Sequence, residues 1–229
     1  LPDSGGYVIP LTKWITNSRP PWNLQSRPIR EKLQVSAAVP VLFSGHAKDR
    51  LLHDLWAGKA SDGCPWQRIA AAGFDAAIGP DFSVWCDAPR IEHIVETKRS
   101  LIAAQRISQA GTPVIPNVFL HNEADAEGLG AWLHRQPTVT AVATNVQCFA
   151  EGDREREEYR SAVALFRRLR ETARRHVALV VIGLAQPKHL ARLRETGFSI
   201  TVVNGRAYQE AFRGQRLVFH PSGHLKTEQ

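Results

Sequence analysis

The sequence predicts an α/β fold built on a parallel, TIM-barrel-like (β/α) sheet. From Val39 onward, short apolar runs alternate with longer segments of helical periodicity, which is the order of βα units. The apolar runs are rich in Val, Ile, Ala and Phe without strict alternation, as expected for strands covered on both faces. Only six strands are distinct, fewer than the roughly eight of a closed barrel of this kind. The barrel is therefore expected to be incomplete, or to be completed by residues beyond the printed sequence.

The strands and helices of this prediction follow one another in regular order. The predicted strands are residues 39–45, 74–83, 112–120, 139–147, 176–185 and 198–205. The predicted helices are residues 49–57, 88–110, 123–135, 154–175 and 187–196. Together they form one predicted barrel domain, residues 39–229.

The helix predicted at residues 154–175 has an apolar stripe and a basic face. The stripe predicts one side packed on the sheet, and consists of Val163, Phe166, Leu169 and Ala173. The basic face carries Arg160, Arg167, Arg168, Arg174 and Arg175. Acidic residues begin this helix and arginines end it, which complements the helix dipole. The arginines are therefore either a solvated face or a phosphate-binding stripe formed by Arg167, Arg168, Arg174 and Arg175.

Residues 1–38 differ in composition and are predicted to be an ordered segment that wraps the barrel. Prolines at positions 20, 21 and 28 exclude a helix running through this segment. Arg19, Arg27 and Arg30 lie among tryptophans, a combination that suits base stacking and phosphate contacts. Packing of the tryptophans over a sheet edge is the alternative.

The overall charge favours a polyanionic partner. Lys and Arg number 29 against 22 Asp and Glu, a net charge of +7. DNA or tRNA is the expected partner, while a basic protein without such a role, or a subunit of a protein complex, is the alternative. The longest apolar run, residues 176–185, is shorter than the roughly 20 residues of a membrane span, so no membrane contact and a cytoplasmic location are expected.

Polar residues follow the predicted strands at their carboxyl ends. In parallel βα folds, ligands bind at these ends because the loops there are free to vary. We therefore predict a substrate-binding pocket at this edge of the sheet. Its residues are His46, Asp49, Ser83, Asp87, Asn117, Thr144, Gln147, Gln186 and Asn204.

Asp81 is the most prominent residue of this group. It ends an apolar strand in the stretch "GPDFS". Partial desolvation at this position strengthens the electrostatic interactions of its charge. A carboxylate accepts two donors at once, which matches the N1 and N2 hydrogens of a guanine-like base. The alternative is a cap for the helix that follows, a role for which Asp87 is better placed.

The sequence gives little support for a metal or a cofactor. His46, Asp49, Asp87 and His121 offer suitable ligand types, but no HxH or HExxH spacing is present, so no metal is expected. No GxSxG motif or glycine-rich phosphate loop occurs, and no cofactor is expected.

The middle of the chain resembles a known family. Asp81-Phe82-Ser83, Asp87 with Pro89, Arg99, Gln105 and "VIPNV" at residues 114–118 are similar to the bacterial and phage family catalogued as domain of unknown function 4417. The resemblance covers roughly residues 39–185. It supports the fold and implies no particular activity.

A second resemblance concerns the stretch "DSGGY" at residues 3–7. It is similar to a "DSGGF/Y" segment of the tRNA-guanine transglycosylases and their relatives that insert deazapurines into DNA, which are (β/α)8 barrels. The resemblance implies that Asp3 is a catalytic carboxylate, that Asp81 contacts the base, and that Ser4, Gly5 and Tyr7 line the substrate site. The chain departs from that family in three respects: the nucleophilic Asp would fall near Val203 or Asn204, the zinc-binding cysteines are missing, and residues 39–45 look like an extra strand between Asp3 and Asp81.

Together these features predict a nucleobase-recognising barrel protein that acts on nucleic acid by transglycosylase-like base exchange at C1′. Asp3 and Asp81 are its expected catalytic residues. The alternative is a non-catalytic nucleic-acid-binding protein or complex subunit with a degenerate pocket. Whether the chain is an enzyme is left open by the sequence.

Overall fold

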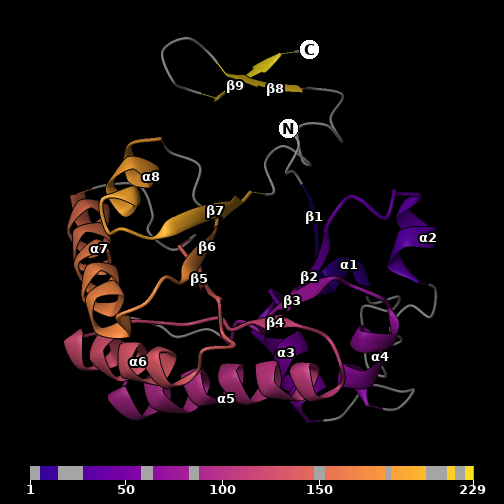
Figure 1. The fold of residues 1–229 in the computed structure, drawn as a ribbon, viewed down its shortest axis with the longest axis horizontal. Helices are drawn as coiled ribbons and strands as arrows, with labels where there is room; N and C mark the ends of the chain where they lie inside the picture. The colour runs from indigo at the N-terminus through magenta and orange to yellow at the C-terminus, as the bar shows by residue number, and fades with distance from the viewer. Residues whose placement is uncertain are drawn as a thin grey trace. The chain divides into compact units, whose positions relative to one another are not determined.

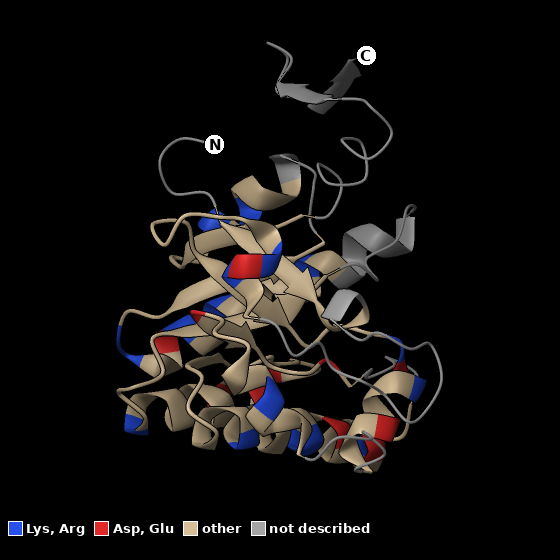
Figure 2. Ribbon diagram, turned by 90° about the vertical axis from the view of Figure 1, so that its right-hand side faces the viewer, with Lys and Arg blue, Asp and Glu red and all other residues tan. Residues whose placement is uncertain are grey.

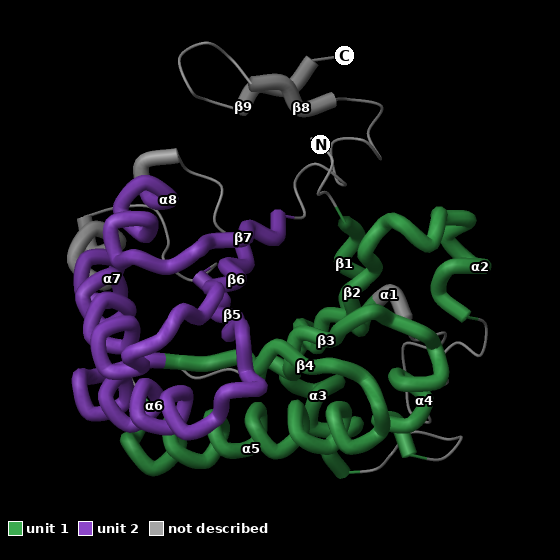
Figure 3. Tube along the Cα trace, viewed as in Figure 1, with its two compact units in different colours: residues 1–119 green, residues 120–229 purple. Residues whose placement is uncertain are grey.

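The chain folds into two compact α/β units, residues 1–119 and 120–229 (Figure 3). The computed structural model describes residues 6–14, 28–57, 64–82, 88–146, 153–183, 187–204, 216–219 and 225–228. In both units, parallel strands alternate with helices (Figure 1). The predicted α/β class with parallel sheets is thus confirmed.

The first unit contains a four-stranded parallel sheet whose strands follow chain order, β1-β2-β3-β4. The strands are β1 (Tyr7–Pro10), β2 (Val41–Ser44), β3 (Ala76–Ile78) and β4 (Val114–Ile115). The helices are α1 (Leu11–Trp14), α2 (Ile29–Leu33), α3 (Asp49–Trp56), α4 (Pro65–Ala71) and α5 (Arg90–Gln109).

One face of this sheet makes the core of the unit. Val41 and Phe43 point to the same side of β2, and Phe43 pairs with Ala77 of β3. These residues belong to one buried cluster with apolar side chains of all five helices, including Leu52 of α3 and Ile107 of α5. Residues in alternate positions, such as Ser44, therefore lie on the face opposite this core.

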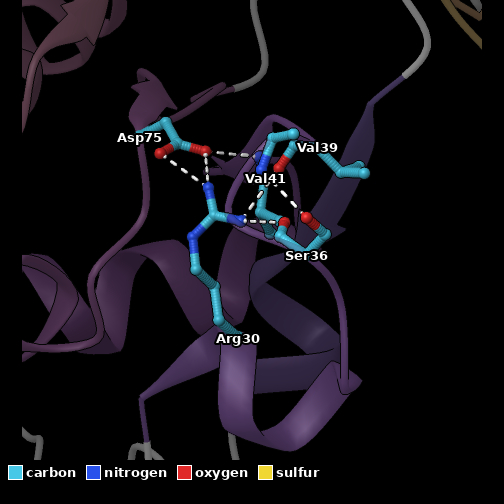
Figure 4. A network of polar contacts seen from close by, with 6 residues as sticks. Arg30, Ser36, Val39, Val41 and Asp75 are labelled. Carbon is cyan, nitrogen blue, oxygen red and sulfur yellow. Dashed lines mark hydrogen bonds and ion pairs between the residues drawn. The ribbon is translucent and has the colours of Figure 1, made fainter.

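A polar network fastens the amino ends of β2 and β3 to α2 (Figure 4). Arg30 donates through Nη2 to both carboxylate oxygens of Asp75, at 2.8 and 2.6 Å, and through Nη1 to the carbonyls of Ser36 and Val39. The backbone N–H of Val41 donates to Asp75 Oδ2 at 2.6 Å. The Val41 N–H, followed by the Arg30 guanidinium, holds the pKa of Asp75 below its usual 3.8, against a raising effect of burial.

The second unit contains a three-stranded parallel sheet in the order β5-β6-β7. The elements are α6 (Glu123–Arg135), β5 (Ala141–Asn145), α7 (Asp153–Ala173), β6 (Ala178–Ile182), α8 (Pro187–Arg194) and β7 (Ser199–Val203). The central strand β6 is buried along nearly all of its length. Two further strands, β8 (Arg216–Phe219) and β9 (Leu225–Glu228), pair with each other in antiparallel fashion.

Helices α6 and α7 pack closely at a glycine. A Cβ atom at Gly130 would lie 2.6 Å from the Cβ of Thr172 on α7, so only glycine allows this approach. Arg175, just after α7, donates through Nε to the Leu133 carbonyl at 2.9 Å, and through Nη2 to the carbonyls of Gln136 and Val139. The end of α6 and the start of β5 are therefore fixed to α7.

Each of the six predicted strands contains one of β2 to β7, although β3 and β4 are much shorter than predicted, and the five predicted helices correspond to α3, α5, α6, α7 and α8. The apolar stripe of α7 is confirmed, since Val163, Phe166, Leu169 and Ala173 are all buried. The sequence did not predict β1, α1, α2, α4, β8 or β9. Two of these helices begin at prolines, because proline is tolerated where a helix starts: Pro28 precedes α2 and Pro65 opens α4.

The predicted domain boundary near residue 38 stays a prediction. The two units divide between Phe119 and Leu120, and residues 7–10 form a strand paired with β2. Most of the N-terminal segment predicted to wrap a barrel lies outside the described residues, so that arrangement stays a prediction.

We expect Gly130→Ala to lower the free energy of unfolding by about 1 to 3 kcal/mol, because the added methyl group meets Thr172. Gly128→Ala is the matched control on the same helix, since nothing lies within 4 Å of a Cβ there. Its higher helix propensity should raise stability by about 0.5 to 1 kcal/mol. Urea unfolding of both variants checks the pair, and equal effects would contradict the packing described.

We expect Asp75→Asn to lower the unfolding free energy at pH 7 by about 1 kcal/mol, since Asp75 is exposed enough for solvent to screen its ion pair. The folded-state pKa of Asp75 is lowered, so its contribution is fully present above the unfolded value near 3.8 and is lost as the pH falls below it. Urea unfolding between pH 7 and pH 3 should therefore show the difference from wild type shrinking below about pH 4. A constant difference across this range would be the contrary result.

Candidate functional site

Four polar side chains meet at the carboxyl ends of β2, β3 and β4 in the first unit. Ser44 ends β2 and His46 follows it, Asp81 follows β3, and Asn117 follows β4. His46 Nδ1 lies 2.8 Å from Ser44 Oγ, and His46 Nε2 lies 3.1 Å from Asp81 Oδ2. Asn117 Nδ2 donates to Asp81 Oδ1 at 3.0 Å. We call Ser44, His46, Asp81 and Asn117 the strand-end cluster.

The backbone brings these side chains together. The N–H of Gly45 donates to the Ile78 carbonyl at 3.0 Å, and the N–H of Gly79 donates to the Ile115 carbonyl at 2.9 Å. A Cβ at Gly45 would lie 2.6 Å from both the N and the Cα of Pro80. Glycine is therefore needed between Ser44 and His46, because the two loops touch through their backbones.

The cluster is deeply buried, and two of its atoms lack a partner. Asn117 is fully buried, and Ser44 and Asp81 are 5% and 9% exposed. Asn117 Oδ1 and His46 Nε2 are buried without a hydrogen-bond partner among the described residues. His46 Nε2 is close to Asp81 Oδ2, but the contact lacks hydrogen-bond geometry. Such buried atoms are uncommon in folded proteins and favour a binding role.

Helix α5 fixes the chain directly after Asp81. The N–H of Phe82 donates to Ser100 Oγ at 3.4 Å, and the Arg99 guanidinium lies 4.6 Å from the centre of the Phe82 ring. Arg99 in turn donates to Glu96, through Nη1, and to His53 Nδ1 at 2.8 Å. Asp81 is thus held by its strand on one side and by α5 on the other.

An apolar cavity lies beside the cluster but is too small for a ligand. Its lining includes Phe43, Leu52, Trp66, Pro80 and Phe82, and its volume is about 10 Å³. That space is close to the least that a single water molecule requires. We interpret it as a packing gap of the core.

Of the other predicted substrate-binding residues of the first unit, the structure describes Tyr7, at the start of a strand, and Asp49, at the start of a helix. Tyr7 is half-exposed on β1, and Asp49 is the first residue of α3, where its charge suits the helix dipole. The residues outside the described parts of the chain are Asp3, Ser4, Gly5, Arg19, Arg27, Ser83, Asp87, Gln147 and Gln186.

In the second unit, two predicted residues lie at strand ends. Thr144 is buried near the end of β5, and Asn204 directly follows β7. Val203 is the last residue of β7 and pairs with Ile182. The position at which the transglycosylase resemblance would place a nucleophilic Asp is therefore a strand end that carries valine and asparagine.

Several of the predicted nucleic-acid-binding arginines make contacts within the protein. Arg30 and Arg175 belong to the networks described above, and Arg168 donates to Glu127 at 2.5 Å, which raises the pKa of its guanidinium. Arg167 and Arg174 are exposed. Figure 2 shows basic and acidic segments interspersed along the ribbon rather than gathered on one element.

Ser44 is the residue of the cluster that sequence reasoning missed. The sequence predicts it only as part of an apolar strand, yet it is a small polar residue at the last position of β2. As the neighbour of Phe43, it points to the opposite face of the sheet. A polar residue at the carboxyl end of a strand, on the face opposite the apolar core, is the signal by which it could have been found.

The described parts of the chain contain neither a cluster of metal-ligating side chains nor a helix suited to span a membrane. There, no group of three or more His, Cys, Asp or Glu side chains gathers closely enough to hold a metal ion. Among the same residues, no helix is both long enough and apolar enough to cross a membrane.

No family model matches the chain, and no curated protein matches it in sequence. The two family resemblances noted in the sequence therefore stay predictions. The geometry of the strand-end cluster is the basis on which a function can be argued.

We expect Asn117→Asp to lower the unfolding free energy by about 2 to 4 kcal/mol at pH 7, because it places a second carboxylate beside buried Asp81. The like charge raises the folded-state pKa of the pair, so the penalty should shrink as the pH falls toward 5. Asn117→Leu, of similar size and uncharged, should lose stability equally at both pH values. Urea unfolding at pH 7 and pH 5 separates the two, and a pH-independent loss in Asn117→Asp would contradict the proximity to Asp81.

Proposed function

We propose that this protein recognises a nucleobase of a nucleic acid at the carboxyl ends of its first sheet, and that its activity is transglycosylase-like base exchange at C1′. The observation that carries the proposal is the strand-end cluster, in which buried Asp81 lies between His46 and Asn117. The site is at the edge of a parallel sheet where ligands of α/β proteins usually bind.

The chemistry of Asp81 suits the edge of a base. An ionised carboxylate has about four lone-pair positions, so an oxygen that already accepts from Asn117 can accept a further N–H. Asn117 adds a buried carbonyl oxygen with no hydrogen-bond partner among the described residues. Two acceptors at one place favour a ligand that presents N–H groups.

Base exchange needs more than base reading. A carboxylate must attack C1′, and a second carboxylate must manage the protons of the departing base. Asp3 is our candidate for this catalytic role, on the resemblance of "DSGGY" to the transglycosylase segment. In this scheme Asp81 contacts the base and Asp3 manages the protons, while the position that the resemblance gives to the attacking carboxylate carries Val203 or Asn204.

The partner is proposed to be DNA or tRNA. The net charge of +7 favours a polyanion, and Arg167 and Arg174 are exposed on or beside α7. A cytoplasmic location is part of this proposal, because both polymers occur there.

We further propose that the strands belong to a (β/α) barrel. In the four-stranded and the three-stranded sheet the strands are parallel and follow chain order, which is the order of a barrel, whereas the strand order of doubly wound sheets reverses at a switch point.

A second candidate is a non-catalytic nucleic-acid-binding protein or complex subunit with a degenerate pocket. One observation favours it. The end of β7 carries Val203 and Asn204 where the resemblance requires a nucleophilic Asp. Binding would then be carried by arginines and would be independent of Asp81.

The test compares wild type with Asp81→Asn for binding to single-stranded DNA, duplex DNA and tRNA at two salt concentrations. We expect one polymer to bind and Asp81→Asn to weaken that binding about tenfold, the value of one hydrogen bond to a charged group. Asp75→Asn is the matched control, since it makes the same substitution at the opposite end of the same strand and should bind like wild type.

Two other results have clear meanings. Equal binding by wild type and Asp81→Asn, with a steep dependence on salt, would favour the non-catalytic candidate. Absence of binding to all three polymers would overturn both. If Asp81-dependent binding is found, exchange of a labelled base into that polymer, lost in Asp3→Ala, tests the enzymatic part.

A further inference from the structure

Ser44 makes a contact that a merely structural serine would not need. Its side chain is buried at the end of β2, and its Oγ lies 2.8 Å from His46 Nδ1. The same Oγ accepts from the backbone N–H of His46 at 3.4 Å. One lone pair of the hydroxyl oxygen accepts this N–H, and the hydroxyl hydrogen can be donated to Nδ1 of a neutral ring.

This arrangement selects one form of the neutral imidazole. If Ser44 donates to Nδ1, that nitrogen carries the lone pair and the ring proton is on Nε2. We assign this tautomer from the hydrogen-bond pattern. His46 Nε2 then presents an N–H to Asp81 Oδ2, 3.1 Å away.

The other tautomer would be unfavourable at this position. A lone pair on Nε2 would face a carboxylate oxygen at 3.1 Å, and the two would repel each other in a buried environment. Nε2 has no hydrogen-bond partner among the described residues, so a hydrogen bond to Asp81 Oδ2, 3.1 Å away, requires the ring or the carboxylate to turn. A hydrogen bond donated by Ser44 to Nδ1 and the carboxylate of Asp81 beside Nε2 thus favour the same tautomer of His46.

We propose that Ser44 and His46 are positioning residues for Asp81. Ser44 sets the tautomer of His46, and the Nε2–H of His46 orients Asp81 Oδ2 while Asn117 holds Oδ1. The carboxylate is thereby fixed in the plane in which it meets the base. This inference rests on the proposed function, because it assigns Asp81 the contact with the base; neither Ser44 nor His46 touches the base.

The backbone supports this role. Gly45 separates Ser44 from His46 and contacts Pro80, the residue before Asp81. A Cβ atom at Gly45 would lie only 2.6 Å from the N and Cα atoms of Pro80. The spacing between His46 and Asp81 is therefore set by backbone contact. What is left to the side chains is the direction of each hydrogen bond.

The test uses variants of Ser44 that differ only in the hydroxyl. Ser44→Thr and Ser44→Val have the same shape, and only Thr keeps the donor to His46. Ser44→Ala is a third variant that adds no atoms, should the larger residues not fit. The tautomer of His46 is read from long-range proton–nitrogen NMR correlation spectra at a pH where the ring is neutral, with its signals assigned by their loss in His46→Gln. Binding to single-stranded DNA, duplex DNA and tRNA is measured on the same samples.

We expect wild type and Ser44→Thr to show the Nε2–H form and to bind alike. Ser44→Val and Ser44→Ala should show a mixture of tautomers and should bind about five- to tenfold more weakly. The same tautomer in Thr and Val variants would overturn the inference, as would a changed tautomer with unchanged binding. If wild type binds none of the polymers, the proposed function fails, and with it the role in positioning Asp81 for a base, while the NMR spectra still decide whether Ser44 sets the tautomer.

Discussion

The candidate site depends on the backbone contact between Gly45 and Pro80. Strands β2 and β3 pair in parallel up to Ser44 and Ile78. The N–H of Gly45, the next residue, donates to the Ile78 carbonyl, so the two chains still lie side by side where they leave the sheet. No side chain fits between Gly45 and Pro80. His46 and Asp81, each one residue further on, are consequently adjacent before any side-chain interaction acts. The backbone of the sheet therefore sets the positions of His46 and Asp81.

The two ends of β3 carry carboxylates with different surroundings. Asp75, before the strand, accepts from a guanidinium and a backbone N–H, and its contacts tie α2 to the starts of two strands. Asp81, after the strand, lies beside an imidazole and an amide, each with a buried atom that lacks a hydrogen-bond partner among the described residues. The first arrangement stabilises the fold, while the second fits a binding site. In parallel βα folds, residues at the amino ends of the strands usually contribute to stability, and residues at the carboxyl ends usually contribute to binding and catalysis.

The basic character of the chain is less available to a polyanion than the net charge indicates. Arg30 and Arg175 donate to backbone carbonyls that join separate elements, and Arg168 is paired with Glu127. Arg167 and Arg174 are exposed. A net charge counts these residues equally, although a guanidinium engaged with carbonyl groups must give up those bonds to contact a phosphate. The distribution of partners is thus more informative than the sum of charges.

The sequence by itself determined the α/β class, six strands, five helices and the buried stripe of α7, because hydrophobic periodicity is a local property of the chain. It also singled out His46, Asp81 and Asn117, since residues that follow parallel strands gather at one edge. It did not find β1 or the division between residues 119 and 120, which depend on pairing between distant segments. Only the tertiary structure decided that Ser44 turns toward His46 and that Arg30 and Arg175 serve the fold. Which hydrogen bonds a polar side chain makes is set by neighbours that are remote in sequence, and no local pattern encodes them.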